Sequence, residues 1–426
     1  AVIKFIFETH IHADFVSGHL DLAKKTGATI VYGPNANTVF ECHNASDNEE
    51  FKIGKITLKA LHTPGHTLES ITYLLIDENG KNHAIFTGDT LFLGDVGRPD
   101  LAIKSNLTEK DLAGMLFKSL RTKIMTLEDS VIIYPAHGAG SACGKNLSKE
   151  TVGTLGDQKK NNYALRANMS KDEFVKEVLD GIGEPPQYFS KNAKLNQSGY
   201  SELDKVLENG NNPLSVSEFE SLATDSNILV LDVRTQKDFI ENHIPGALFI
   251  GLNGGFAPWV GALISNIKQG ILLVVPEGKS EEAITRLARV GYDYTLGYLE
   301  GGMQAWIAAG KTSEQLTSIS SIEFQQRTKK EVLSVLDVRK QGEYNTMHLK
   351  LDGLIHLSLD QINHRLDEID TQETYYIHCA GGYRSVIAAS ILKANGFHNV
   401  IDIAGGFAAI KQTDLSLTDS TCSSIV

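Results

Sequence analysis

Four short segments in the first third of the chain carry histidine and aspartate at spacings that suit a metal ion. The segment from His10 to Asp14 places two histidines and an aspartate at every second position, where side chains of an extended chain share one face. His66 lies in Thr-Pro-Gly-His-Thr, Asp89 in Thr-Gly-Asp-Thr and His137 in Pro-Ala-His-Gly. Each segment follows a strand-like run, and strand ends are where sites are usually built. A lone histidine mostly has a packing or surface role, but four such segments in order predict a metal site.

A second set of reactive residues lies near the C-terminus, where the strand-like run from Tyr375 to His378 ends in a loop and a helix-like segment follows. The loop reads Cys379, Ala380, Gly381, Gly382, Tyr383, Arg384 and Ser385. Glycines let backbone N–H groups turn inward, and with Arg384 and the helix N-terminus they predict a positive cradle for the cysteine sulfur. Such a cradle favours the thiolate, the nucleophilic form of cysteine. A cysteine that only packs has no need of it.

The residues before about position 197 alternate short β-rich runs with helical stretches, which is typical of an α/β domain. An opening strand is predicted over residues 1–9, and the further strands that position the site are predicted over 28–32, 56–61, 70–76, 84–87 and 131–134. A helix is predicted after the first histidines, with Ser17 as its N-cap and Gly27 at its end. The residues from Asp77 to Gly80 predict a hairpin turn.

Two breaker regions divide the chain into three predicted domains. Gly, Asn and Ser gather over 197–213, and Ser and Thr accumulate over 311–319. After each break the chain repeats one pattern, with Leu-Asp-Val-Arg at 231–234 and again at 336–339, and matching glycine turns later on. A repeat of about 100 residues is long enough to be a duplicated domain. We therefore predict domains over 1–197, 212–310 and 318–416.

The order of the histidine and aspartate segments resembles the metallo-β-lactamase superfamily over residues 1 to about 197. The resemblance implies an αββα sandwich with metal at one edge of the strands, and it implies that strands upstream of the first histidines are missing here. Most hydrolases of the superfamily have a histidine directly after the first aspartate, where it helps to hold a second metal, but this chain has Phe15. An apolar ring cannot ligate, so a dinuclear zinc site is disfavoured. One ion held by two imidazoles and one carboxylate is expected instead, which is the facial triad of non-haem iron(II) oxygenases.

Residues 94–101 and 138–145 are similar to the persulfide dioxygenase branch of that superfamily. The resemblance implies one Fe(II) per chain, with zinc as the alternative metal. The iron ligands of the family match three residues of this chain: His10, His66 and Asp89. A supporting role behind the ligands, orienting them or a bound water, is expected for three more: His12, Asp14 and His137.

Three residues of the same similar segments are weaker candidates to contact the substrate: Arg98, Cys143 and Lys145. Arg98 is a candidate anchor for an acidic thiol carrier, but a salt bridge to Asp95 or Asp100 is an equal alternative. Cys143 is a candidate sulfur relay, although a small buried packing role is the commoner state of such a cysteine.

The C-terminal loop, in which four residues separate a cysteine from an arginine, resembles the active loop of rhodaneses. The match covers the whole second repeat, since the Leu-Asp-Val-Arg and Gly-Gly segments belong to the same family. Related phosphatase loops are one residue longer, so the resemblance implies that Cys379 carries a sulfane sulfur, with Arg384 beside it. The equivalent loop of the first repeat, over residues 273–280, has no cysteine. That repeat cannot carry a persulfide, and we expect it to be a spacer or docking module.

Together the resemblances imply an enzyme of sulfide detoxification. The first domain would oxidise a thiol persulfide, such as that of glutathione or coenzyme A, with O2 to sulfite and the parent thiol. The last domain would join a sulfane sulfur to sulfite as thiosulfate, or work in reverse. One alternative is a zinc-dependent, glyoxalase II-like thioester hydrolase fused to a sulfurtransferase, with metal-bound hydroxide as nucleophile. Another is a non-catalytic sulfane-sulfur carrier or sensor.

Composition limits the partners and the compartment. The 426 residues carry a formal net charge of −12, which argues against nucleic acid, and no apolar run approaches the roughly 20 residues that span a bilayer. The four cysteines, at positions 42, 143, 379 and 422, are too scattered to suggest a disulfide framework, so a reducing cytoplasm is expected. Because the chain opens in a strand without an initiator Met, its start is expected to be missing, and with it any targeting segment. A homo-oligomer is expected.

Overall fold

The computed structural model describes residues 2–102, 107–145 and 147–418. Cys422 and Ala1, the first residue of the predicted opening strand, lie outside these ranges. The chain forms two compact units, Ala1–Glu202 and Leu203–Val426, each with its own sheets. Within the described ranges, no helix is both long and apolar enough to pass through a bilayer.

The first unit contains two sheets. The smaller sheet is parallel and consists of β1 (Phe5–Phe7), β2 (Thr29–Tyr32) and β3 (His43–Asn44) in that order. The larger sheet is mixed and follows chain order through β4 (Glu50–Ile53), β5 (Ile56–His62), β6 (Ile71–Ile76), β7 (Asn82–Gly88), β8 (Ile132–Pro135) and β9 (Gly153–Thr154). Its β7 and β8 pair in parallel, because the long crossover that includes α2 (Glu109–Ser119) joins them.

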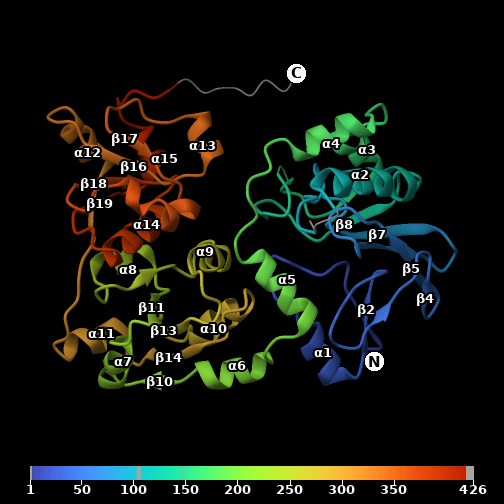
Figure 1. Cartoon of the computed structure of the whole chain (residues 1–426), viewed down its shortest axis with the longest axis horizontal. Helices are drawn as coiled ribbons and strands as arrows, with labels where there is room; N and C mark the ends of the chain where they lie inside the picture. The colour runs from blue at the N-terminus through green and yellow to red at the C-terminus, as the bar shows by residue number, and fades with distance from the viewer. Residues whose placement is uncertain (1, 103–106, 146, 419–426) are drawn as a thin grey trace. The chain divides into compact units, whose positions relative to one another are not determined.

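The first unit has four layers, in the order helix, small sheet, large sheet and helix (Figure 1). Apolar side chains that alternate along the strands join these layers. On β2, Val31 faces the space between the sheets and packs with Tyr73 of β6, while its neighbour Ile30 packs in a cluster with residues of α1 (His19–Thr26). On β6, Leu74 turns to the face opposite Tyr73 and belongs to a cluster with Phe174 of α4 (Lys171–Leu179). This period-two pattern is what a sheet buried on both faces requires. The predicted αββα sandwich is confirmed.

Helix α1 begins one residue later than predicted. Its N-cap is Gly18 rather than Ser17, because the Ser17 hydroxyl donates to the Glu8 carboxylate at 2.6 Å and does not cap the helix. Its end is as predicted, since Gly27 has a left-handed φ of 71° and its N–H bonds to the carbonyl of Ala23. The other helices of the unit are η1 (Leu120–Ile124), α3 (Leu155–Asn161), η2 (Tyr163–Leu165) and α5 (Phe189–Ser198).

The second unit contains two parallel five-stranded sheets that share one strand order. The first runs β10 (Pro213–Leu214), β14 (Thr295–Leu299), β13 (Gly270–Val274), β11 (Ile228–Asp232) and β12 (Leu248–Phe249). The second runs β15 (Thr317–Ile319), β19 (Val400–Ile403), β18 (Tyr375–His378), β16 (Ser334–Asp337) and β17 (Leu354–His356). Identical topology in both copies is what a duplicated domain requires.

Corresponding helices flank the two sheets of the second unit. Those of the first copy are α7 (Val216–Ala223), α8 (Gln236–Glu241), α9 (Phe256–Leu263), α10 (Ser280–Ala288) and α11 (Gly302–Ala308). Those of the second copy are α12 (Ser321–Thr328), α13 (Gln341–Thr346), η3 (Leu359–His364), η4 (Leu366–Glu368), α14 (Tyr383–Ala394) and α15 (Gly406–Ile410).

An additional helix, α6 (Leu203–Gly210), lies inside the polar region over 197–213 where a domain boundary was predicted. It packs against α10 and β14 of the first copy. Val206 and Gly210 are its buried residues, and the remaining surface is mostly polar, which explains why composition alone indicated a boundary and not a helix.

Phe174 and Phe324 are each fully buried in separate cores, which gives a test of the two units. Phe174→Ala should destabilise the first unit by about 3–5 kcal/mol, because it removes a buried ring and leaves a cavity. Phe324→Ala in α12 should do the same to the second unit. Calorimetry of the full chain should show two unfolding transitions, with each variant lowering one of them. A single transition that both variants shift would contradict the division.

Candidate functional sites

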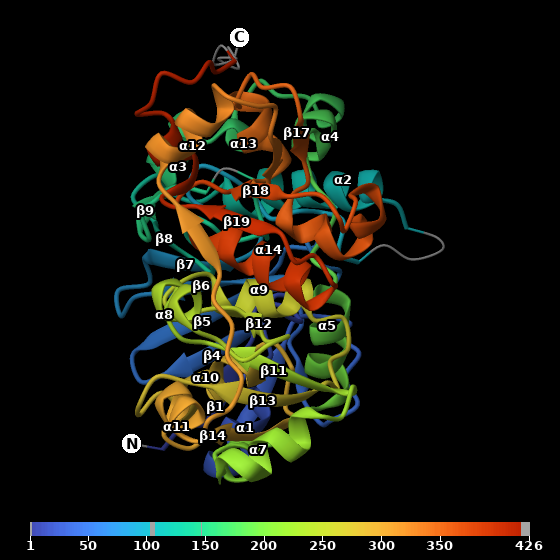
Figure 2. The ribbon, with the colours of Figure 1, turned by 90° about the vertical axis from the view of Figure 1, so that its left-hand side faces the viewer.

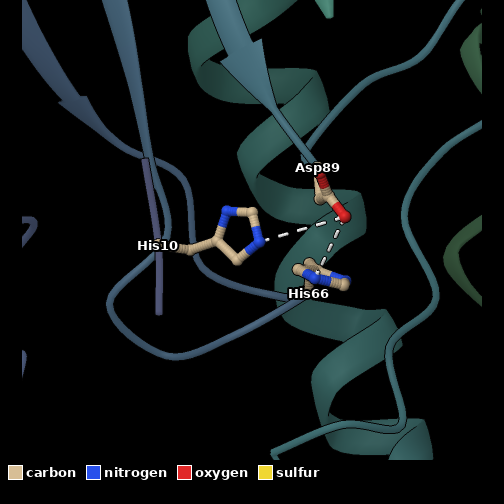
Figure 3. Close-up of side chains that lie close together, drawn as sticks. All are labelled: His10, His66 and Asp89. Carbon is tan, nitrogen blue, oxygen red and sulfur yellow. Dashed lines mark ion pairs between the residues drawn. The ribbon is translucent and has the colours of Figure 1, made fainter. Parts of the chain in front are cut away.

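The ends of three strands in the first unit bring His10, His66 and Asp89 together. His10 follows β1, His66 follows β5 and Asp89 follows β7. Nε2 of His10 lies 3.9 Å from Oδ2 of Asp89, and Nε2 of His66 lies 3.4 Å from the same oxygen. Figure 3 shows both imidazoles directed at this carboxylate, and one ligand atom of each residue lies within 4.8 Å of the other two. Three donors at this separation can converge on one metal ion.

The chemistry of this group fits a cation. Each of the three residues is only 1% exposed, and neither carboxylate oxygen of Asp89 has a hydrogen-bond partner among the described residues. A buried carboxylate without partners is strongly unfavourable, so a cation is the group that would balance it. Burial, and then the neighbouring imidazoles, lower the pKa of His10 well below its ordinary value and keep it in the neutral form that binds metals. Two imidazoles and one carboxylate suit both iron(II) and zinc.

The loop that contains Gly97 and Arg98 fixes the orientation of His66. Nδ1 of His66 lies 2.8 Å from the backbone carbonyl oxygen of Arg98, and a proton donated there leaves Nε2 available as a ligand atom. Gly97 permits this close approach, because a Cβ in its place would lie 2.0 Å from the carbonyl oxygen of Asp89 and 3.1 Å from Nδ1 of His66. Glycine at this position therefore supports two of the three candidate ligands at once.

A second group of donors faces the other oxygen of Asp89. Ligand atoms of Asp14, His137 and Cys143 lie within 4.8 Å of one another. Nε2 of His137 is 3.4 Å from Oδ1 of Asp89 and 3.4 Å from Oδ2 of Asp14. Burial and the charges of Asp89 and Asp14 raise the pKa of the Cys143 thiol well above its ordinary value. In this surrounding the thiol stays protonated unless a cation is bound beside it.

Glu8 and His19 extend the site into a buried network that the sequence did not reveal. Nε2 of His12 lies 3.1 Å from Glu8, Nδ1 of His19 lies 3.4 Å from it, and the Ser17 hydroxyl donates to it. Burial alone would raise the pKa of Glu8, but these partners lower it to about 2. Burial in turn opposes the charge on His12, yet Glu8 raises the pKa of this imidazole. His12 is thus paired with Glu8. The sequence offered one indication that Glu8 has a role, which is its charge directly after an apolar strand.

Asn196 of α5 ties the histidine segment to a distant part of the first unit. Its amide nitrogen donates to the carbonyl oxygens of His12 and Phe15 at 2.8 and 2.7 Å, and its amide oxygen accepts the N–H of Ser17 at 2.8 Å. These bonds hold a segment that has no regular secondary structure. A polar residue in a helix gave no sequence signal for this role.

Arg98 and Lys145, predicted as candidates for substrate contact, use their charged groups to hold loops. Two guanidinium nitrogens of Arg98 bind the Asp100 carboxylate at 2.7 Å each, and the group also donates to two backbone carbonyl oxygens. Nζ of Lys145 donates to two backbone carbonyl oxygens near the end of α4, at 2.6 and 2.8 Å. These contacts favour the salt-bridge alternative for Arg98, with Asp100 as the partner, and a structural role for Lys145.

In the second unit, Cys379 follows β18 and the loop through Ala380 and Gly381 leads directly into α14. Sγ of Cys379 accepts a hydrogen bond from the N–H of Gly382 at 3.2 Å and lies 3.7 Å from Oγ of Ser385. Gly382 has a left-handed φ of 97°, which side chains disfavour and which turns its N–H toward the sulfur. Cys379 itself is 1% exposed. The loop thus gives the sulfur a backbone donor at a helix N-terminus, a setting that favours a bound negative charge.

Arg384 of the same loop forms an ion pair that the sequence did not predict. Its guanidinium makes two bonds, of 2.7 and 2.8 Å, to the carboxylate of Glu343 in α13. Burial opposes the charge on Arg384, but Glu343 raises the pKa of the guanidinium, and Cys379 contributes in the same direction. Part of the positive charge expected beside the sulfur is therefore offset by Glu343.

The first copy keeps the loop conformation without the nucleophile. Asp232 pairs with Val274 in its sheet as Asp337 pairs with His378 in the other, which places Val275 at the position of Cys379. By the same register Gly278 corresponds to Gly382, and it has a left-handed φ of 70°. Both copies therefore keep the left-handed glycine of the turn, but the first copy lacks the cysteine.

Comparison with known families identifies the repeat. The rhodanese-like domain family matches residues 215–309 and 320–413. Both copies in the second unit are therefore rhodanese-like domains.

The first unit has curated relatives with two kinds of activity. A probable hydroxyacylglutathione hydrolase of Schizosaccharomyces pombe is 34% identical over 135 residues, which is 32% of this chain and 48% of that protein. The mitochondrial persulfide dioxygenase ETHE1 of Bos taurus is 29% identical over 184 residues, which is 43% of this chain and 63% of that protein. The chain thus spans less than two thirds of the length of either relative.

A solved structure is similar over a longer stretch. The crystal structure of a metallo-beta-lactamase from Staphylococcus aureus subsp. aureus COL is 33% identical with a TM-score of 0.59, and the match covers 70% of this chain and 84% of that one. A match of this extent continues beyond the first unit, which ends at Glu202 of the 426 residues. The chain therefore belongs to the metallo-β-lactamase superfamily, and in it this fold is fused to two rhodanese-like domains.

Proposed function

We propose that this chain is a persulfide dioxygenase fused to a thiosulfate-type sulfurtransferase that serves sulfide detoxification. The observation that carries the proposal is the presence, in one chain, of a buried site with two histidines and one carboxylate and of a rhodanese-type cysteine loop. The first kind of site suits oxygen chemistry and the second suits transfer of sulfane sulfur. Similarity to the persulfide dioxygenase ETHE1 supports the first half.

In the first unit, His10, His66 and Asp89 would hold one iron(II) ion, which supplies the redox chemistry between a persulfide sulfur and O2. The net reaction converts a thiol persulfide, O2 and water to the parent thiol, sulfite and two protons. The protein keeps the ligands aimed at one point, since the Arg98 carbonyl oxygen fixes His66 and His137 lies in contact with the Asp89 carboxylate.

In the second unit, the Cys379 thiolate attacks the outer sulfur of a persulfide, which forms a cysteine persulfide and releases the parent thiolate. Sulfite then attacks that outer sulfur, which yields thiosulfate and regenerates the thiolate. The Gly382 N–H stabilises the negative sulfur in both resting and persulfide states, and Arg384 adds a positive charge that Glu343 holds in place. Sulfite made in the first unit is the natural acceptor for the second.

The identity of the carrier and the setting belong to the same proposal. A low-molecular-weight thiol such as glutathione or coenzyme A would carry the persulfide, and the chain would act in the cytoplasm as a homo-oligomer. Its net charge of −12 makes nucleic acid an unsuitable partner.

A zinc-dependent thioester hydrolase is the second candidate function, and one observation favours it. Asp14, His137 and Cys143 form a donor group beside Asp89, so that Cys143 could supply the donor that Phe15 removes. A second metal held there would supply the chemistry of thioester hydrolysis, and the chain is similar to a probable hydroxyacylglutathione hydrolase. Turnover of a hydroxyacylglutathione thioester by the purified chain would favour this candidate.

His66→Ala should abolish the dioxygenase reaction, because it removes a metal ligand and leaves the buried Asp89 charge less balanced. Oxygen uptake on addition of glutathione persulfide should fall by more than about 100-fold, and a chelator should have the same effect on the unaltered chain. Transfer of sulfur from persulfide to sulfite should stay at its original rate in both cases. Undiminished oxygen uptake by the variant would refute the ligand assignment.

Cys379→Ala should separate the two reactions. Oxygen uptake should continue, but sulfite should accumulate in place of thiosulfate because the persulfide carrier is absent. Ion chromatography of the products measures both species. Cys42→Ala is the control, since Cys42 is another free cysteine and belongs to neither donor group of the first unit. Thiosulfate formation that persists in Cys379→Ala would exclude transfer through this cysteine.

Gly97→Ala should weaken the metal site without removing any ligand. The added Cβ would push against the Asp89 backbone and the His66 ring, and misplacement of that kind should lower metal affinity and oxygen uptake by about 10- to 100-fold. Gly183→Ala is the control for a glycine substitution in the same unit, because a Cβ there would meet nothing within 4 Å and the backbone is not left-handed. Equal metal content in wild type and Gly97→Ala would contradict the role assigned to Gly97.

A further inference from the structure

Tyr383, the residue of the catalytic loop that begins α14, makes its main contacts in the cysteine-less rhodanese-like domain. Its hydroxyl donates to the carbonyl oxygen of Gly251 at 2.7 Å. Its ring lies on Gly254, where a Cβ would come within 2.2 Å of Cζ and 2.5 Å of the two Cε atoms. Phe249 borders the ring at a centroid distance of 6.0 Å. Gly251 and Gly254 together form what we call the tyrosine seat, which admits the ring because Gly254 has no side chain.

Helix α14 as a whole lies between the two domains. All residues from 385 to 392 are buried, whereas a helix at a protein surface leaves one polar face in water. It contacts β18 and β19 of its own sheet and β12 and α8 of the cysteine-less domain (Figure 2). At the edge strand β12, the N–H of Phe249 donates to Oγ of Ser390 at 3.0 Å. The two domains therefore share a core along this helix.

The tyrosine seat occurs in the first copy alone, and the tyrosine occurs in the second copy alone. By sheet register, Lys279 of the first copy corresponds to Tyr383, and it forms an exposed bond to Glu282 of its own helix instead. Likewise Ser358 of the second copy corresponds to Gly251, and its hydroxyl donates to Asp360 two residues away. Neither of these contacts joins the domains. The two copies thus carry complementary residues at one contact.

The seat is braced by its own domain and is adjacent to the sulfur cradle. Arg286 of α10 donates to the carbonyl oxygen of Leu252, within the seat segment, at 2.6 Å. Tyr383 directly follows Gly382, whose N–H bonds to the sulfur of Cys379. Fixing the Tyr383 side chain fixes the first turn of α14, and with it the direction of that N–H.

Building on the sulfur transfer proposed for Cys379, we propose that the cysteine-less domain positions the catalytic loop: its seat holds Tyr383 and so keeps the Gly382 N–H directed at the reacting sulfur. Tyr383 acts through Gly382 and is a positioning residue. The cysteine-less domain then takes part in catalysis, which goes beyond the spacer or docking role expected from the sequence.

Gly254→Val in the full chain tests this, because it fills the seat without changing any residue of the catalytic loop. Formation of thiosulfate from glutathione persulfide and sulfite should show a kcat about tenfold lower, the effect of one hydrogen bond to a charged sulfur, with KM for sulfite nearly unchanged. The rate of Cys379 alkylation by iodoacetamide at neutral pH should fall by a similar factor, since the thiolate loses its donor. Gly255→Ala is the matched control: its Cβ would meet Trp259 at 3.4 Å, an ordinary contact, and both readouts should stay unchanged.

Tyr383→Ala gives an independent route, because it empties the seat instead of crowding it. It should reduce kcat and alkylation about as much as Gly254→Val, and the double variant should be no worse than either single one. Unchanged kcat and alkylation in Tyr383→Ala, or losses that add in the double variant, would overturn the proposal. Failure of sulfur transfer itself is distinguishable: if Cys379→Ala still forms thiosulfate, the proposed function falls whatever the seat variants do.

Discussion

The buried carboxylate of Asp89 imposes the constraint that the first unit is arranged to meet. Both of its oxygens are withdrawn from water and have no hydrogen-bond donor among the described residues. A charge in that position needs a cation close by, because desolvation otherwise makes it strongly unfavourable. The two sheets of the sandwich end around it and deliver His10 and His66 on one side and His137 on the other.

Because each oxygen of Asp89 faces a different donor group, the chemistry depends on whether one ion or two are bound. For oxygen chemistry, the group formed by Asp14, His137 and Cys143 has to bind no metal and only hold the Asp89 carboxylate in position. The Cys143 thiol then stays protonated, as its raised pKa indicates. For hydrolysis, the same thiol would have to lose its proton to solvent and bind a second metal as a thiolate. Phe15 stacks on His12 where a further imidazole would serve such a metal, which favours the single-ion arrangement.

Sequence patterns predicted those features that local physics controls, and missed those that depend on long-range contacts. Alternation of apolar and polar residues predicted that each histidine segment follows a strand. Glycine conformations and capping predicted the end of α1 at Gly27 and the loop between β18 and α14. Asn196 and Glu343 are ordinary polar residues whose partners lie far away in the chain, so no local pattern marks them. The seat for Tyr383 depends on the absence of a side chain in another domain, which a sequence does not indicate.

The metal content of anaerobically purified protein tests the central claim most directly, if the chain and its Cys143→Ala variant are compared. The single-ion account predicts one iron per chain in both, because Cys143 only borders the group formed by His10, His66 and Asp89. Two zinc ions per chain, with one of them lost in Cys143→Ala, would contradict it.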